Sequence, residues 1–151
     1  LIEAVILSKI VPWKINYPSV DLDLTNEIKK SESPVALKCA ALAKIDSFND
    51  CLKIYTDASK NNCGAAAAFY IPEFRLEGFA KLPDLISIYT VELIAIKLAI
   101  FWLNSVSSNI PNKILILSDS AVYILYRLEL VIQDLTYYIV FSNSALKLLL
   151  T

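Results

Sequence analysis

The chain has 151 residues, of which 56% are hydrophobic and 19% are charged, and its formal net charge is −1. This length is enough for one domain with a sizeable buried core and too short for two. The near-zero charge excludes a global basic field that would attract nucleic acid, so any nucleic-acid contact needs a local patch. The chain contains no histidine, which excludes His-based general-base catalysis and His-ligated zinc.

The three cysteines, Cys39, Cys51 and Cys63, are odd in number and form no Cys-x-x-Cys pair. They favour reduced thiols in an intracellular protein, without distinguishing cytoplasm from nucleus. The N-terminus lacks the basic region and the small-residue cleavage site of a signal peptide. Because the chain starts at Leu1 and ends directly after an apolar run, we expect it to be a piece of something longer.

Residues 1–51 are predicted to be a connecting segment that contains one helix. Residues 1 to about 33 carry prolines and a charge run and show no sustained hydrophobic period, so we expect them to be irregular. "SPVALKCAALAKIDSF" then predicts a helix, with Ser33 as its N-cap and Pro34 at its first position. The apolar stripe of this helix is Ala36, Leu37, Ala40, Ala41 and Ile45.

Three strands are predicted to follow. "LKIYTD", Leu52–Asp57, is the first strand, and it ends on the carboxylate of Asp57. "SKNNCG" has the composition of a turn, "AAAAFYI" reads as a second strand, and "FRLEGFAKL", Phe74–Leu82, reads as a third. The short links between these strands predict an antiparallel meander.

A long helix is predicted over residues 90–105, with Thr90 as its N-cap and with Glu92, Ile96, Ala99 and Leu103 on one face. "KILILS", residues 113–118, is apolar on both faces, as a central strand covered by helices would be, and "DSAVYILYRL" predicts a second, short helix. Residues 52–151 are therefore predicted to form an α/β domain with a mixed sheet. An antiparallel three-strand meander and a parallel strand make this sheet, with helices on its faces.

One window, residues 85–103, is long and apolar enough to span a bilayer. Glu92 and Lys97 lie near its middle, where the burial of charge is costly. We therefore expect no membrane contact.

Three acidic residues occupy unusual positions. Asp57 and Asp119 each follow an apolar strand, and Glu92 lies in the first turn of a helix on its apolar face. Singly, each has a structural explanation, since Asp is common in turns and a helix dipole favours Glu near its N-terminus. Jointly, they indicate a site, because the carboxyl ends of parallel neighbouring strands lie side by side and a crossover helix would bring Glu92 to the same edge.

Three carboxylates at one edge would repel each other and could ionise together only if cations held them. Mg²⁺ is the natural choice, because it is a hard ion that prefers oxygen ligands. Two such ions about 4 Å apart activate a water and stabilise the leaving oxygen of a phosphodiester. This chemistry needs no histidine.

"IYTDASK", "IYTVELIAIKLAI" and "ILILSDSAVYIL" resemble the three acidic motifs of type 1 ribonuclease H domains, most closely those of non-LTR retrotransposon polyproteins. The upstream "VPW" and "VDLDLT", followed by a helix, resemble the stretch that precedes the nuclease in such polyproteins. The likeness covers roughly residues 10 to 128.

The resemblance implies Mg²⁺-dependent hydrolysis of the RNA strand of an RNA·DNA hybrid, with Mn²⁺ as an alternative ion, inside a longer reverse-transcriptase polyprotein. The residues at matching positions are Asp57, Glu92 and Asp119 as catalytic metal-binding carboxylates, Ser59, Lys60 and Asn61 near the substrate backbone, and Ser120 as a support for Asp119. The family distinguishes RNA from DNA partly by contacts to the 2′-hydroxyl.

The sequence also departs from the family pattern. Ala58 stands where the family usually has glycine, and the second strand keeps only Gly64. The fifth strand, the loop that often carries His and the fourth acid cannot be placed, since the context of Asp134 does not match. Ser142–Ala145 echo Ser118–Ala121 with Asn143 in place of the acid, and an amide cannot replace a charged metal ligand.

Two further hypotheses remain open from the sequence. The domain could be a catalytically dead relic that binds at most nucleic acid or a protein partner. Alternatively, the chain could be a membrane-associated or interaction protein that uses its apolar segments and forms no carboxylate cluster.

Overall fold

The computed structural model describes residues 19–21, 33–106, 110–118 and 136–141. In chain order the elements are β1 (Ser19–Asp21), α2 (Pro34–Asp46), β2 (Leu52–Asn61), β3 (Gly64–Ile71), the 3₁₀ helix η2 (Pro72–Phe74), β4 (Leu76–Leu82), α3 (Ile88–Ser105), β5 (Lys113–Ser118) and β6 (Thr136–Phe141). The predicted helix after residue 118 lies outside the described residues.

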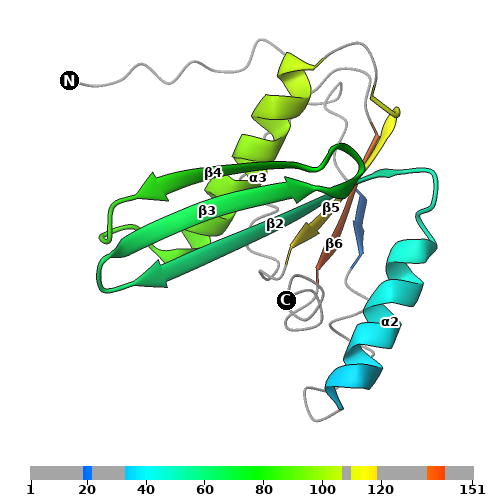
Figure 1. Cartoon of the computed structure of the whole chain (residues 1–151), viewed down its shortest axis with the longest axis horizontal. Coiled ribbons are helices and arrows are strands. Elements are labelled where there is room, and N and C mark those ends of the chain that lie inside the picture. The colour runs from blue at the N-terminus through cyan, green and yellow to red at the C-terminus, as the bar shows by residue number, and fades with distance from the viewer. Residues whose placement is uncertain (1–18, 22–32, 107–109, 119–135, 142–151) are drawn as a thin grey trace.

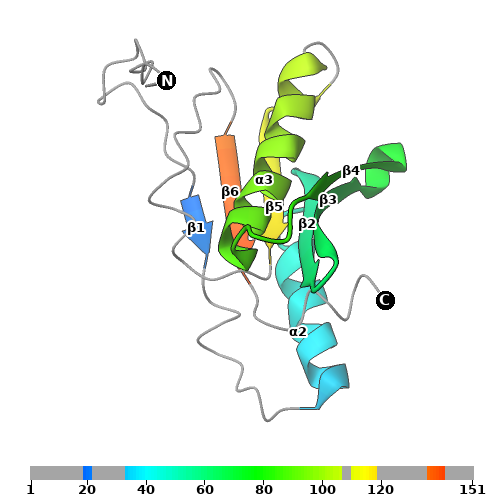
Figure 2. The ribbon, with the colours of Figure 1, turned by 90° about the vertical axis from the view of Figure 1, so that its left-hand side faces the viewer.

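All described strands join one six-stranded sheet in the order β1-β6-β5-β2-β3-β4. The strands β2, β3 and β4 form an antiparallel meander, and β5 pairs with β2 in parallel (Figure 1). Figure 2 shows β6 beside β5, and β1 lies beside β6 in parallel register. The predicted α/β class with a mixed sheet is confirmed, and the arrangement is consistent with a ribonuclease H-like fold.

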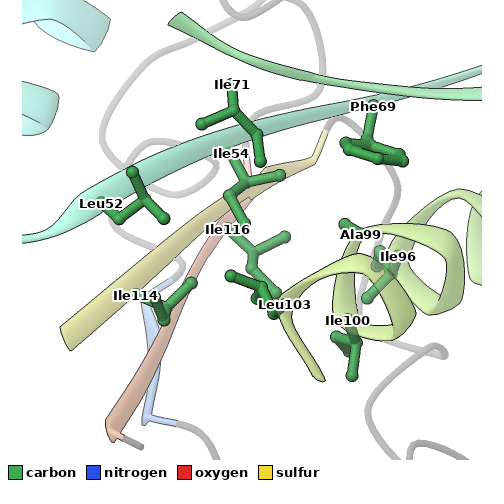
Figure 3. Close-up of a cluster of buried hydrophobic side chains, with 10 residues drawn as sticks. All are labelled: Leu52, Ile54, Phe69, Ile71, Ile96, Ala99, Ile100, Leu103, Ile114 and Ile116. Atoms are coloured by element: carbon green, nitrogen blue, oxygen red, sulfur yellow. The ribbon is translucent and has the colours of Figure 1, made fainter. Parts of the chain in front are cut away.

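The helix α3 covers one face of the sheet through a core of fully or nearly fully buried aliphatic side chains. Figure 3 shows Ile54 and Ile116 of neighbouring strands beside each other, with Leu103 of α3 next to Ile116. Both isoleucines are 0% exposed, and burial of each stabilises the fold by about 1.5–3 kcal/mol. The predicted apolar face of the helix, which includes Glu92, Ile96 and Ala99, is confirmed as its buried face.

The helix α2 packs on the opposite face of β5. Strand residues alternate between faces, so Leu115 and Leu117 point away from α3 and contact the cluster that contains Leu37, Ala41 and Ile45 of α2. The N-cap prediction is confirmed, because the Ser33 hydroxyl accepts a hydrogen bond from the amide of Ala36 at 3.3 Å. Of the predicted stripe, Ala36 and Ala40 are not buried.

Residues before position 33 are not all irregular, as the sequence had suggested. The short strand β1 adds to the sheet, and Asp21 at its end forms an ion pair with Lys44 of α2, with 2.6 Å between the Asp21 carboxylate and Nζ. The periodicity of hydrophobic residues does not reveal a strand of three residues, because this strand is defined by its pairing with β6, which is far away in the sequence. The predicted boundary between residues 51 and 52 stays a prediction.

The predicted end of the first strand at Asp57 is wrong. The strand β2 continues to Asn61, because Ser59, Lys60 and Asn61 pair with the start of β3. The turn is reduced to Asn62 and Cys63, and the Asn61 side-chain oxygen accepts a hydrogen bond from the amide of Cys63 at 2.8 Å. The polar residues at the end of β2 therefore belong to an arm of the β-hairpin and not to its loop.

Three other boundaries differ from the prediction. The third strand of the meander begins at Leu76 rather than Phe74, because η2 and the left-handed Arg75, with φ of 49°, make the turn before it. The helix α3 begins at Ile88, and its N-cap is Ser87 rather than Thr90. A fifth strand, which the sequence did not place, is present as β6.

One described helix, α3, is long and apolar enough to cross a membrane by length and composition, with mean hydropathy of 1.4 over its 18 residues. This is weak evidence for a membrane span, because the core helix of a globular domain passes the same test. In this structure the helix packs its buried face on the sheet.

Gly78 allows a close contact that a larger residue would break. A Cβ added at Gly78 would lie 2.6 Å from Cζ of Phe69, the residue opposite it on β3, and the Phe69 ring is buried. We expect Gly78→Ala to lower the free energy of unfolding by about 1–3 kcal/mol, measured by urea denaturation. In a Phe69→Leu background the same substitution should cost less, and equal costs in both backgrounds would contradict this contact.

The cysteines are predicted to differ in reactivity. Cys39 and Cys63 are exposed, whereas Cys51 is buried, and burial, followed by the charge of Asp50, raises the pKa of the Cys51 thiol. A thiol reagent at pH 8 should therefore label Cys39 and Cys63 quickly and Cys51 only after unfolding. Because the unfolded thiol ionises first, Cys51 should also lower stability as the pH rises above about 8.5. Equal labelling of all three cysteines in the native state would refute the packing around Cys51.

Candidate functional site

Asp57 lies within β2, where the sheet changes from parallel to antiparallel pairing. It is half-buried and opposite Ala68 of β3. Its neighbours Thr56 and Ala58 are buried, and Ala58 packs against α3. Strand alternation therefore places the Asp57 side chain on the face away from α3.

On that face Asp57 borders a hollow of about 260 Å³. Tyr55 of β2 and Tyr70 of β3 contribute aromatic walls, and Ala68 of β3, the residue opposite Asp57, lies between β2 and β4. The remaining lining residues are Phe69, Glu77, Gly78 and Phe79. A half-buried carboxylate at the border of a hollow is accessible to a ligand, whereas a carboxylate that only ends a strand would be solvated on all sides.

Glu92 is buried on the sheet-facing side of α3 and is 5% exposed. Both neighbours along its face, Val91 and Ala95, are fully buried and belong to the same cluster as Ala58. Glu92 is the fifth residue of α3 and not part of the first turn, where the helix dipole acts most strongly. Because burial of a carboxylate is costly, neither packing nor the helix dipole explains this glutamate by itself.

Asp57 and Glu92 each adjoin, along the chain, one residue of the same apolar cluster. Ala58 follows Asp57 directly, Val91 precedes Glu92 directly, and these two apolar residues belong to one packed cluster. The two carboxylates lie on opposite faces of the sheet, since Asp57 points away from α3 and Glu92 is on the side of α3 that faces the sheet.

The strand β5 runs beside the first part of β2. Its described pairing with β2 stops at Leu117, opposite Tyr55, and the Thr56 hydroxyl donates a hydrogen bond to the Leu117 carbonyl at 3.1 Å. Ser118, the last residue of β5, is fully buried. The backbone of Asp57 therefore extends beyond the described pairing with β5, at the carboxyl end of that strand, which is where open α/β sheets bind ligands.

Asp119 and Ser120 lie outside the described residues, and so do Asp134 and Asn143. The described part of the chain contains no group of three or more side chains that could hold a metal ion. Of the three predicted carboxylates, the structure describes Asp57 on β2 and Glu92 on α3, on opposite faces of the sheet, and a metal site formed by them with Asp119 stays a prediction. Carboxylate oxygens of this kind fit Mg²⁺ by their chemistry.

The three residues predicted near the substrate backbone differ in their surroundings. Ser59 is exposed on β2, and Asn61 closes the hairpin turn through its side-chain oxygen. Lys60 shares the α3-facing side of β2 with Ala58, and its Nζ donates a hydrogen bond to the carbonyl oxygen of Ile86 at 2.7 Å. A contact of any of them with substrate stays a prediction.

The Lys60 bond is a feature that sequence reasoning missed. Ile86 directly precedes Ser87, whose hydroxyl accepts a hydrogen bond from the Thr90 amide at 3.2 Å and thereby caps α3. Lys60 thus ties the far end of β2 to the start of the helix that carries Glu92. The only signal in the sequence was the alternation of residues between the two faces of the first strand, and that strand was predicted to end at Asp57, before Lys60.

Ala58 does not strain the backbone at this position. Among the described non-glycine residues only Arg75 has a positive φ, so Ala58 and the alanines of β3 have ordinary extended backbone. Ala58, Ala65 and Ala67 are buried against α3. Alanine therefore fits these positions without the conformational cost that a left-handed residue would carry.

No protein-family model matches the chain, and no curated protein matches it either.

Lys60→Met should loosen the start of α3 while keeping the apolar stem of the side chain. We expect faster hydrogen exchange at the Val91 and Glu92 amides and a loss of about 1 kcal/mol in the free energy of unfolding. Lys97→Met, which removes an exposed lysine from the same helix, is the matched control and should change neither quantity. Unchanged exchange in Lys60→Met would show that the bond to Ile86 does not hold the helix.

Proposed function

We propose that the chain is a ribonuclease H-like domain that hydrolyses the RNA strand of RNA·DNA hybrids in the presence of Mg²⁺ or Mn²⁺. In this proposal Asp57, Glu92 and Asp119 hold the metal, and the domain is part of a longer reverse-transcriptase polyprotein. The observation that supports it is Glu92, a carboxylate that is 5% exposed on the sheet-facing side of α3.

The residues would act by position and charge. In the proposal Asp57 and Glu92 would converge with Asp119, which follows Ser118, the final residue of β5, in the sequence. A divalent ion bound there supplies an activated water and stabilises the leaving oxygen of the phosphodiester. Carboxylates that must converge on one ion explain why a glutamate is retained on the buried face of a helix, where an aliphatic residue would be more stable.

Substrate contacts would come from the end of β2. Ser59 is exposed there and can donate to a phosphate or accept from a 2′-hydroxyl, while the cation of Lys60 lies on the α3 side of the strand. The overall charge of −1 makes such local contacts necessary, since the chain has no general basic field.

A catalytically dead relic is the second candidate. Asn143 stands in the sequence echo at the position of an acid, and an amide cannot supply the charge of a fourth carboxylate. Such a relic would keep the fold and the Asp57–Glu92 arrangement but bind metal weakly and turn over no substrate.

The test is cleavage of a labelled RNA·DNA hybrid with Mg²⁺ or Mn²⁺. We expect the full chain to cut the RNA strand, and we expect Asp57→Asn and Glu92→Gln each to lower the rate about 100-fold or more. Asp84→Asn changes an exposed acid away from the site and should cleave at the original rate. Circular dichroism of every variant verifies that loss of activity is not loss of fold.

The outcomes separate the two candidates. Cleavage that depends on both acids supports the nuclease. Cleavage that survives Asp57→Asn would come from a contaminant and would remove the assignment of this site. Folded protein that cleaves nothing with either ion would establish the relic.

A further inference from the structure

The strand β4 is an edge of the sheet that no described strand covers on its outer side. It is the last member of the strand order, and Figure 1 shows it as the outermost strand of the meander. An edge strand of seven residues presents unpaired backbone N–H and C=O groups to any segment that can pair with it. Natural proteins usually block such edges, so the side chains on this edge indicate what it can accept.

The sequence of β4 is self-complementary when it is read in the antiparallel direction. The strand is Leu-Glu-Gly-Phe-Ala-Lys-Leu, with Phe79 at its centre. A two-fold axis at Phe79 places Glu77 opposite Lys81 of the second copy, Phe79 opposite Phe79, and Leu76 opposite Leu82. The same axis places Gly78 opposite Ala80, two small residues.

The burial pattern matches this pairing on both faces. Glu77, Phe79 and Lys81 are exposed on one face, and Phe79 is 79% exposed, which is unusual for a large aromatic side chain. Leu76, Gly78, Ala80 and Leu82 are half-buried on the other face, where Leu76 and Leu82 pack at the margin of the core. A paired second strand would cover the exposed phenylalanine and extend this margin.

We propose that β4 is a homodimer interface, in which two copies of this chain pair their β4 strands antiparallel about Phe79. The arrangement is isologous, so each copy contributes the same residues and the two edges close on each other. Two Glu77–Lys81 pairs flank a Phe79–Phe79 pair on one face. The interface shares Glu77 and Phe79 with the hollow that Asp57 borders, but the proposal does not rest on the proposed nuclease function.

The charges select this occupant over others. In parallel pairing Glu77 would face Glu77 and Lys81 would face Lys81, and like charges directly opposite each other are unfavourable. A shift of the antiparallel register by two residues would also break both ion pairs. Only the antiparallel arrangement centred on Phe79 pairs both charges at once.

The dimer should be weak. A single seven-residue strand pair falls at the low end of specific interfaces, below about 1,200 Å² of buried surface, so we expect a dissociation constant in the range of about 1–100 μM. Association of this strength depends on concentration and is measured by sedimentation velocity over a dilution series of the full chain.

A charge-swap experiment tests the pairing directly. Glu77→Lys and Lys81→Glu each place like charges opposite each other in both pairs of the homodimer, and each should raise the dissociation constant about tenfold or more. The double variant Glu77→Lys/Lys81→Glu restores opposite charges and should dimerise like the original chain. An equal mixture of the two single variants should form a heterodimer, because both of its charge pairs are again complementary.

Lys97→Glu, on the exposed part of α3, is the control for a change in net charge and should leave the dissociation constant unaltered. A chain that stays monomeric at about 1 mM would overturn the proposal, because this concentration is far above the expected dissociation constant. A dimer that is insensitive to the single swaps, or that the double variant fails to restore, would also overturn it, because the association would then use another surface. Hybrid cleavage is not part of this readout, so failure of the dimer and failure of the nuclease remain distinguishable.

Discussion

The parallel pairing of β2 with β5 is the constraint on which both the core and the candidate site depend. It aligns Ile54 with Ile116, so that alternate residues of two central strands form a continuous apolar surface for α3. The same pairing directs Leu115 and Leu117 to the other face, where α2 covers them. Because strand alternation is fixed, one register determines both layers of the domain.

The candidate residues lie around the last described pair of this register. Beyond the Tyr55–Leu117 pair, β2 continues through Asp57 to Asn61. Glu92 is buried on the sheet-facing side of α3, where a carboxylate is costly for the core. Strand alternation puts the two carboxylates on opposite faces of the sheet, and their convergence on one ion belongs to the proposal.

The outer half of the sheet has a different character. Towards β4 the core cluster contains four alanines and Val91, with Leu82, Ile86, Ile94 and Leu98 packed against it, and Gly78 lets the Phe69 ring lie close to the backbone of β4. Each alanine buries little apolar area, so it stabilises this half less than a buried isoleucine stabilises the main core. In the proposed dimer, a second copy paired with β4 adds backbone hydrogen bonds and apolar contacts to the part of the sheet where the buried side chains are smallest.

The sequence alone determined the class of the fold, the order of its main elements and the placement of Glu92 on a buried face, because these depend on local hydrophobic period. It did not determine that β2 passes through Asp57, that Ser87 caps α3, or that β1 and β6 join the sheet. Strand ends and short edge strands depend on partners far away in the chain, such as the pairing of Lys60 with Ala65 or of Val20 with Ile139.

For the candidate site, the sequence supplied the residue types, and the tertiary structure decided how they approach each other. The order of motifs along the chain could suggest that Asp57 and Glu92 belong together, but only the structure shows that Ala58 and Val91, their chain neighbours, share one apolar cluster and that the two acids lie on opposite faces of the sheet. The role of Lys60 at the start of α3 was likewise invisible in the sequence, because a lysine's partner is set by the loop that folds over it and not by its neighbours in the chain.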